Sequence, residues 1–278
     1  MALTVNTNLS SLVVQQNLAD ATTSLNRAIE RMTTGYKINH AKDNAAGYSI
    51  STNWTTQLGS IDVALENASM GMDMLTTMEG NLELITGHLQ RLRDLTEQAA
   101  NGTFGTTSLN AIKEEMDARI TEITRIATNA EYNGITLFDN KSADVVLQVG
   151  IKGGTTDKIS VDKTLFANVD ATTLLGSGFS TAAATTAGAP AKLTALDTVI
   201  TNVSKKLTSI GAVQNRLESA ISTLNVLSEN VTSSLSTIKD SDVAAESSAY
   251  IKSQILQQAS ATLLSTANQA PSIALNLL

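Results

Sequence analysis

The 278-residue chain contains no cysteine, which excludes disulfide bonds, thiol catalysis and cysteine-ligated metal sites. It has only two prolines, so few positions interrupt a long helix. Aromatic residues make up 3% of the chain, and a core must therefore be built from aliphatic side chains. The formal net charge of −7 argues against sequence-independent binding of nucleic acid. Together these shortages favour a long helical protein with an aliphatic core.

Charge is also scarce at both ends of the chain. Before Arg27 the only charged side chain is Asp20, and none follows Lys252. Asn, Thr, Ser and Gln recur through both ends, so we expect neither a signal peptide nor a membrane-spanning helix there. Exposed helices of monomers usually carry charges. We therefore expect both ends to pack against partner molecules, the alternative being that they pack on each other within one molecule.

Apolar residues recur at alternating steps of three and four, which indicates coiled-coil-like helices. The pattern covers about 18–32, 61–92, 109–127 and 196–224. Between Leu75 and Met78 the step is three where four is due, a change that locally overwinds a coiled coil. Gln214 occupies one position of the apolar seam, where a polar residue can fix the register.

The sequence also contains residues that are typical of helix ends. Asn101-Gly102 predicts the end of a helix at a glycine C-cap, and Thr107-Ser108 predicts the cap of the next helix. That helix should end at residues 131–134. The period then changes to two, which predicts a β-hairpin over about 144–163. Residues 171–190 are small and rich in Ser and Thr, so we expect a linker there.

Nothing in the sequence indicates catalysis. The two histidines, His40 and His88, do not form an H-E-x-x-H motif, and no phosphate-binding loop, dinucleotide fingerprint or G-x-S-x-G elbow occurs. Met72 and Met78 fall on seam positions and are better explained as core filling than as metal ligands. We expect no enzymatic activity, no cofactor and no bound metal.

Five strings in both arms of the chain resemble a known family. They are RMTTGYKINHAKDNAAG (31–47), LQRLRDLTEQAANGT (89–103), EYNGITL (131–137), IGAVQNRLESAI (210–221) and QILQQASATLLSTANQAP (254–271). The chain resembles bacterial flagellin, in a short form without large variable outer domains. The resemblance covers roughly residues 1–140 and 191–278.

The resemblance implies a mainly α fold: a long antiparallel coiled-coil-like helical bundle formed by the N- and C-terminal arms, with a small β-hairpin region in the middle. Residues 1–43 and 237–278 would form an inner core that is disordered in the monomer. Residues 44–190 and 191–236 would form a helical rod. The residues expected to pack the inner core are Leu9, Leu18, Leu25, Ile255, Leu256 and Leu263.

The resemblance also implies two sets of contact residues. Asn39, Lys42, Asp43 and Asn44 would form the spoke between the inner core and the rod. A plain helix cap by Asp43 and Asn44 is a second reading, compatible with the first.

The other set matches the positions at which a host Toll-like receptor detects flagellins: Gln90, Arg91, Leu95 and Glu115. Arg91 should point outward, and Leu95 should lie at the margin of the seam. A surface for contacts between subunits is the alternative use of the same face.

The function that the resemblance implies is that of a structural subunit, which self-assembles into the helical homopolymer of the flagellar filament. Implied partners are the flagellar cap and hook-junction proteins, an export chaperone and the Toll-like receptor, with no nucleic acid and no membrane insertion. The chain would leave the cell through the flagellar export channel without a cleaved signal peptide. Flagellins are often O-glycosylated in their middle region, so Ser and Thr within 171–186 or near Thr155 are candidate sites, with an unmodified flexible loop as the equal alternative. The alternatives are a hook–filament junction protein and a non-flagellar helical binding module of a secretion system.

Overall fold

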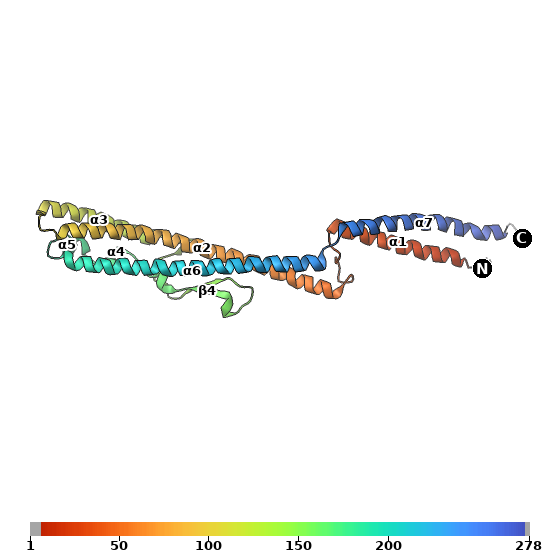
Figure 1. Cartoon of the computed structure of the whole chain (residues 1–278), viewed down its shortest axis with the longest axis horizontal. Coiled ribbons are helices and arrows are strands. Elements are labelled where there is room, and N and C mark those ends of the chain that lie inside the picture. Colours follow the sequence, from red (N-terminus) through yellow and green to blue (C-terminus); the bar gives the residue numbers. More distant parts are fainter. Residues whose placement is uncertain (1–6, 276–278) are drawn as a thin grey trace. The chain divides into compact units, whose positions relative to one another are not determined.

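The computed structural model describes the backbone of residues 7–275 and the side chains of residues 7–269. The chain divides into two compact units (Figure 1). The first contains Met1–Leu58 and Glu229–Leu278, and the second contains Gly59–Ser228. The two longest helices, α2 (Ala45–Ala100) and α6 (Ala189–Lys239), contribute residues to both units.

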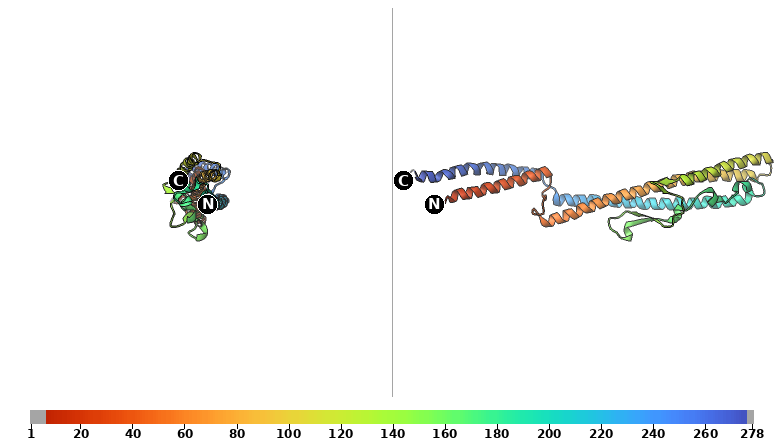
Figure 2. Two further views of the ribbon diagram at one scale, coloured as in Figure 1. Left: turned by 90° about the vertical axis from the view of Figure 1, so that its left-hand side faces the viewer. Right: turned by 180° about the vertical axis from the view of Figure 1, so that it is seen from behind.

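The first unit is built on α1 (Leu9–Thr34) and α7 (Val243–Leu275), which lie side by side (Figures 1 and 2). Helix α1 begins where the Asn8 side chain accepts from the Ser11 N–H, and it ends at Gly35 with φ 73°. Both are ordinary helix boundaries, a side-chain N-cap and a left-handed glycine. Asp242 precedes α7 and caps it, since its carboxylate accepts from the Ala244 N–H at 2.8 Å.

The second unit contains the aliphatic core that the heptad pattern predicts. Helices α2, α3 (Thr106–Asn129) and α6 supply most of this core. Its fully buried side chains include Leu82, Ile85, Leu89, Leu92, Met116, Ile123, Leu196, Ile210 and Leu217. Helix α2 continues without interruption through Leu75 and Met78, both completely buried, so the short step in the heptads does not break the helix.

Two small antiparallel hairpins lie between α3 and α6 in the sequence. β3 (Val145–Gln148) pairs with β4 (Lys158–Val161), from Val145 opposite Val161 to Gln148 opposite Lys158. A short 3₁₀ helix, η1 (Thr155–Asp157), precedes β4. This hairpin lies within the predicted range of 144–163.

The second hairpin was not predicted. α3 ends at Asn129, and β1 (Glu131–Tyr132) then pairs with β2 (Ile135–Thr136). Asn133 and Gly134 form the turn with φ 49° and 74°. Two successive positive φ angles match the two-residue turn that Asn-Gly favours. The segment that was predicted only to end a helix therefore also reverses the chain.

The prediction of a linker at 171–190 is wrong for much of that segment. After a 3₁₀ turn, η2 (Lys163–Phe166), the chain forms α4 (Ala171–Leu175) and α5 (Phe179–Ala183). Leu175 and Phe179 are buried in the core. Asp170 caps α4 by accepting from the Thr173 N–H at 2.6 Å. Few but well-placed apolar residues give this Ser/Thr-rich stretch a packed structure.

Two predicted helix ends also need correction. α3 begins at Thr106 with Gly105 as its N-cap and without a side-chain cap, so Thr107-Ser108 lie inside the helix. α2 does end at Ala100, but Gly102 is not among the residues with positive φ. The chain therefore leaves α2 through a turn rather than through a left-handed glycine.

The fold class predicted from sequence is confirmed: the chain is mainly helical, its N- and C-terminal arms pair, and a hairpin region lies in the middle. Within residues 7–275, no helix combines the length and the apolar character needed to cross a bilayer. The two compact units are defined by contacts within a single chain. The division into inner core (1–43 with 237–278) and rod (44–190 with 191–236) stays a prediction about an assembly.

Candidate functional site

The α1–α7 pair is held together by polar contacts along its length. At one end the Asn8 side-chain amide donates to the Ala267 carbonyl oxygen at 2.7 Å, and the Ser11 hydroxyl donates to Asn268 Oδ1 at 2.8 Å. Further along, the Gln257 amide donates to the Thr22 hydroxyl at 3.2 Å. These contacts set the two helices antiparallel and fix their register.

The seam between these helices is made of small side chains. Its buried members are Ser11, Ala21, Ala28, Ser253 and Ser260. Small residues let two helix backbones approach closely, but they bury little apolar area. Because burial is worth roughly 25 cal/mol per Å², the pair gains little stability from this seam.

Large apolar side chains of the same helices point away from the seam. Those exposed by more than half include Leu9, Leu12, Val13, Ile251, Ile255 and Leu263. Ile251, Ile255 and Leu256 also line a shallow groove of about 420 Å³ on α7. We call these outward residues of α1 and α7 the apolar face. Apolar surface of this kind marks sites of protein contact.

The six residues predicted to pack the inner core lie mainly on this face. Within one chain Leu18 and Leu25 are half-buried, whereas Leu9, Ile255, Leu256 and Leu263 are exposed. Leu18 and Leu25 stand at heptad steps from Ser11 and border the buried Ala and Ser side chains. Packing of the inner core by all six residues stays a prediction about an assembly.

The connections next to α1 and α7 are joined to each other. The Lys37 N–H donates to the Lys239 carbonyl oxygen and the Ser241 N–H donates to the Gly35 carbonyl oxygen, both at 2.8 Å. Tyr36 and Asp240 form the antiparallel bridge between these two bonds. We call this pairing of residues 35–37 with 239–241 the joint.

Of the predicted spoke residues, Asp43 closes the turn that follows the joint. Its Oδ2 accepts from the Asn39 N–H at 3.2 Å and from the His40 N–H at 3.0 Å. The bond from His40, followed by the weaker one from Asn39, holds the pKa of Asp43 below its ordinary value. The expectation that Asp43 caps the next helix is wrong, because its oxygens bind the preceding turn.

Asn44 is the residue that caps α2, since its Oδ1 accepts from the Gly47 N–H at 2.9 Å. Gly47 is buried, and a Cβ there would lie 2.7 Å from Ile38 Cδ1, so the helix start packs tightly on the turn. Lys42 is exposed and takes no part in these contacts. The structure thus brings Asn39, Asp43 and Asn44 together and leaves Lys42 outside.

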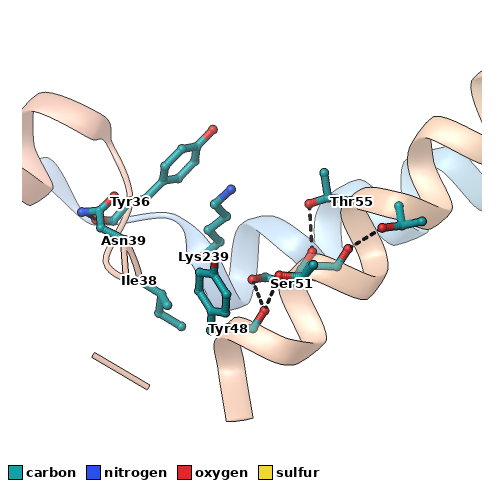
Figure 3. A pocket seen from close by; sticks show the side chains of 9 residues that line it. Tyr36, Ile38, Asn39, Tyr48, Ser51, Thr55 and Lys239 are labelled. Atoms are coloured by element: carbon teal, nitrogen blue, oxygen red, sulfur yellow. Dashed lines mark hydrogen bonds between the residues drawn. The ribbon is translucent and has the colours of Figure 1, made fainter. Parts of the chain in front are cut away.

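Beside the joint lies a polar hollow that the sequence analysis did not identify. It has a volume of about 330 Å³ and is lined by Tyr36, Tyr48, Lys239 and a row of hydroxyl side chains. Figure 3 shows Lys239 extending toward Tyr36, whose ring centroid is 4.1 Å from Nζ. The Ser51 hydroxyl donates to the Tyr48 carbonyl oxygen at 2.9 Å. Two tyrosines twelve positions apart in a chain poor in aromatics were the signal available in the sequence.

The predicted receptor residues fall into two groups. Arg91 on α2 and Glu115 on α3 form a two-point ion pair, with Nε–Oε1 at 2.9 Å and Nη2–Oε2 at 3.2 Å. The hydrogen bond from Arg91 lowers the pKa of Glu115. Gln90 is exposed beside Arg91. Leu95, in contrast, is 1% exposed, so the expectation that it lies at the margin of the seam is wrong.

No group of three or more His, Cys, Asp or Glu residues that could hold a metal ion occurs among the residues the structure describes.

Comparisons with known proteins match both arms of the chain. Residues 5–143 match the family model of the bacterial flagellin N-terminal helical region, and residues 193–278 match that of the C-terminal helical region. A B-type flagellin of Pseudomonas aeruginosa is 42% identical over 161 residues, 58% of this chain and 33% of that protein. A flagellin of Shigella flexneri is 35% identical over 204 residues, 72% of this chain and 36% of that protein.

The chain thus spans about a third of the length of these two relatives, and 45% of Flagellin 1 of Proteus mirabilis, to which it is 39% identical. Among solved structures it is similar to a putative flagellar hook-associated protein from Vibrio parahaemolyticus, with a TM-score of 0.60 and 18% identity. That match covers 71% of this chain and 100% of the other. At this identity the likeness describes the fold alone.

Proposed function

We propose that this chain, which belongs to the bacterial flagellin family, is a subunit of an extracellular flagellar filament. Membership of this family identifies a structural protein rather than an enzyme. The observation that carries the proposal is the exposed apolar face of α1 and α7. Covering this face with other copies would remove apolar surface from water and so stabilise the assembled subunit.

The geometry of the assembly follows from the asymmetry of the chain. An interface between two different surfaces repeats without closing, and repeated copies then form an open helical polymer. In the proposed filament, residues 1–43 and 237–278 form the inner core, while 44–190 and 191–236 form the rod. Residues 39–44 act as the spoke between them. The spoke proposal is supported by the compact turn that Asp43 and Asn44 close.

We also propose that the inner-core segments are disordered before assembly. A pair of helices with a small-residue seam buries too little apolar area to offset the entropy of ordering both helices. Circular dichroism of monomer and polymer tests this directly. Helix content should rise on polymerisation, and equal content in both states would contradict it.

Electron microscopy of the purified full chain after salt-induced polymerisation tests the assembly. We expect long filaments from the unmodified chain and none from Ile255→Asp, which places a carboxylate on the apolar face. The matched control is Ala261→Asp on the same helix, at an exposed position that helical spacing places about 80° or more around the axis from the α7 residues of that face. Filaments from both variants would refute the role of the apolar face, and none from the unmodified chain would refute the proposed function.

The partners implied by this role are the flagellar cap, the hook-junction proteins and an export chaperone. We propose that the chain reaches the cell exterior through the flagellar export channel without cleavage of a signal peptide. The small size of residues 171–190 and their buried Phe179 support a rod surface without a large outer domain. Intact-mass measurement of the native protein tests for O-glycosylation in this region.

A second proposed activity is recognition by the host Toll-like receptor, supported by the exposed Gln90 beside the Arg91–Glu115 pair. Arg91 keeps 43% of its side chain exposed, so part of the guanidinium is available to a partner. Leu95 would contribute by supporting α2 from inside the core. A reporter-cell assay with soluble monomer should give a signal that Arg91→Ala removes. Arg125→Ala, which breaks a surface ion pair with Glu122 on α3, should retain it. No signal from the unmodified chain would refute this activity.

A further inference from the structure

The loop between α2 and α3 contains the first of two Asn-Gly pairs in the sequence. Asn101-Gly102 opens this loop, and Asn133-Gly134 forms the β1–β2 turn. An asparagine followed by glycine can cyclise, because glycine has no side chain to hinder attack by its own backbone nitrogen. The fold places these two Asn-Gly pairs in different surroundings.

Around Asn101 the backbone is open to solvent. Every residue from Asn101 to Ser108 is exposed, and a Cβ placed on Gly102 would meet nothing within 4 Å. The turn from Asn101 to Phe104 is closed by one long hydrogen bond of 3.4 Å. Among the described residues the Gly102 N–H has no hydrogen-bond acceptor. The nitrogen of Gly102 is therefore accessible to base, and the backbone can rotate at little cost.

The Asn101 side chain is also held in a position that favours this cyclisation. Its Oδ1 accepts from the Thr103 N–H at 3.2 Å, which lays the carboxamide along the backbone beside Gly102. A donor on this oxygen stabilises the negative charge that develops there when the carbonyl carbon is attacked. The Thr103 N–H thus occupies the place of one oxyanion-hole donor.

We propose that Asn101 is a site of spontaneous deamidation, at which the chain ages to aspartate and isoaspartate. Water or hydroxide takes the proton from the Gly102 nitrogen, and that nitrogen forms a bond to Cγ of Asn101. The Cγ–Nδ2 bond then breaks, and ammonia leaves with a proton from solvent. The product is a cyclic succinimide. Water opens it at either carbonyl carbon, giving aspartate or isoaspartate without any oxidant or reductant.

Asn133 is protected from the same reaction by its hairpin. Its φ of 49° is fixed by the pairing of Tyr132 with Ile135 and of Glu131 with Thr136. Closing the ring requires rotation about the Cα–C bond of the asparagine until the glycine nitrogen faces Cγ. In the hairpin this rotation would separate the paired strands. The two Asn-Gly pairs should therefore react at different rates in the folded chain.

The modification would act on the end of α2. It adds a carboxylate just beyond Ala100, at the negative end of the helix dipole, where the last turn has no basic residue. Isoaspartate also adds a methylene to the main chain between positions 101 and 102. Both changes loosen the start of the loop and leave the buried core untouched.

Peptide mapping by mass spectrometry tests the proposal on the full chain incubated at mildly alkaline pH. In the folded protein Asn101 should convert about tenfold faster than Asn133. We expect this rate factor to be smaller than the effect of a buried oxyanion-hole donor, because solvent screens the electrostatic interactions of the exposed loop. In urea the two rates should become nearly equal. A ratio near one in the folded state, a faster reaction at Asn133, or the same ratio in urea would overturn the proposal.

Two variants isolate the donor. Thr103→Pro removes the N–H that points at Oδ1 and should slow conversion of Asn101, whereas Thr103→Ala keeps this N–H and should leave the rate unchanged. Circular dichroism verifies that both variants fold. Equal rates in the two variants would show that the donor has no effect and would overturn that part of the proposal.

Discussion

Arg31 Nη1 lies 3.1 Å from Glu246 Oε1, and this ion pair joins α1 to α7 next to the joint. Both side chains are largely buried, and Arg31 Nε is the buried side-chain nitrogen or oxygen without a hydrogen-bond partner among the described residues. A charge in such a position is costly without its partner.

In the assembled polymer, where the α1–α7 pair is proposed to be ordered, Glu246→Gln should therefore destabilise this pair by about 1 kcal/mol, because Arg31 loses the carboxylate that offsets its desolvation. Urea unfolding of the polymer followed by circular dichroism measures this change. Glu229→Gln on α6, at an exposed position, is the control and should change stability by less than about 0.5 kcal/mol. A loss of the same size in both variants would contradict the prediction.

Leu95 and Leu84 lie on the same helix with opposite environments, 1% and 59% exposed. Leu95→Ala should cost about 2–5 kcal/mol, because it leaves a cavity in the core. Leu84→Ala should stay within about 0.5 kcal/mol of the unmodified chain. Thermal unfolding compares the two. Equal effects would mean that Leu95 is not in the core, and its proposed indirect role in receptor recognition would then fail.

Gly71 marks the place where the β3–β4 hairpin packs on α2. A Cβ at Gly71 would lie 2.5 Å from Leu147 Cδ1, so Gly71→Ala forces this side chain to move. We expect a net loss of about 1 kcal/mol, since strain outweighs the gain in helix propensity. Gly80→Ala has open space around it and should instead raise stability by about 0.5–1 kcal/mol. Opposite signs in urea unfolding are the test.

The stability of the folded chain should depend on pH through Lys206 on α6. Its ammonium donates to the carbonyl oxygens of Thr164, Leu165 and Ala167 at 2.6, 3.3 and 3.2 Å, and burial lowers the pKa of Lys206 to about 8. Above this pH the folded chain has released the proton, whereas the unfolded chain keeps it up to a pKa of about 10.4. The unfolded state then binds more protons, so stability rises with pH.

Between pH 8 and 9.5 this rise should amount to at most about 1 kcal/mol, because solvent screening weakens the effect at a side chain that is only partly buried. Urea unfolding at several pH values measures it, and Lys206→Met should remove the rise. A fall in stability over this range that Lys206→Met abolishes would mean that the three carbonyl oxygens, rather than burial, control the pKa of Lys206.

The helical core could be predicted because its signal is repetitive. Leu82, Ile85, Leu89 and Leu92 recur at heptad spacing, and each is buried in the structure. The alternation around Val145 and Val161 predicted a hairpin for the same reason, since one face of a strand is covered and the other is not. In a long periodic segment, a single residue that departs from the pattern does not change the predicted structure.

The features that were missed depend on single residues or on other molecules. Phe179 buries a segment whose composition predicts a linker, and Asn133-Gly134 forms a hairpin too short to show any period. In the terminal helices the family resemblance named Leu9, Ile255 and Leu263 as residues of an inner core. The sequence could not show that these side chains are exposed within one chain, because which face is paired depends on the partner present.

The joint is made of main-chain atoms, and this has a consequence for how the sequence around it can change. Its two hydrogen bonds use the N–H groups of Lys37 and Ser241 and the carbonyl oxygens of Lys239 and Gly35. Side chains at positions 37, 239 and 241 can therefore be exchanged without losing the bonds, whereas Gly35, with φ 73°, resists a side chain. Proline at position 37 or 241 removes a donor. The chemistry of this surface can therefore change while the connection between the two segments is kept.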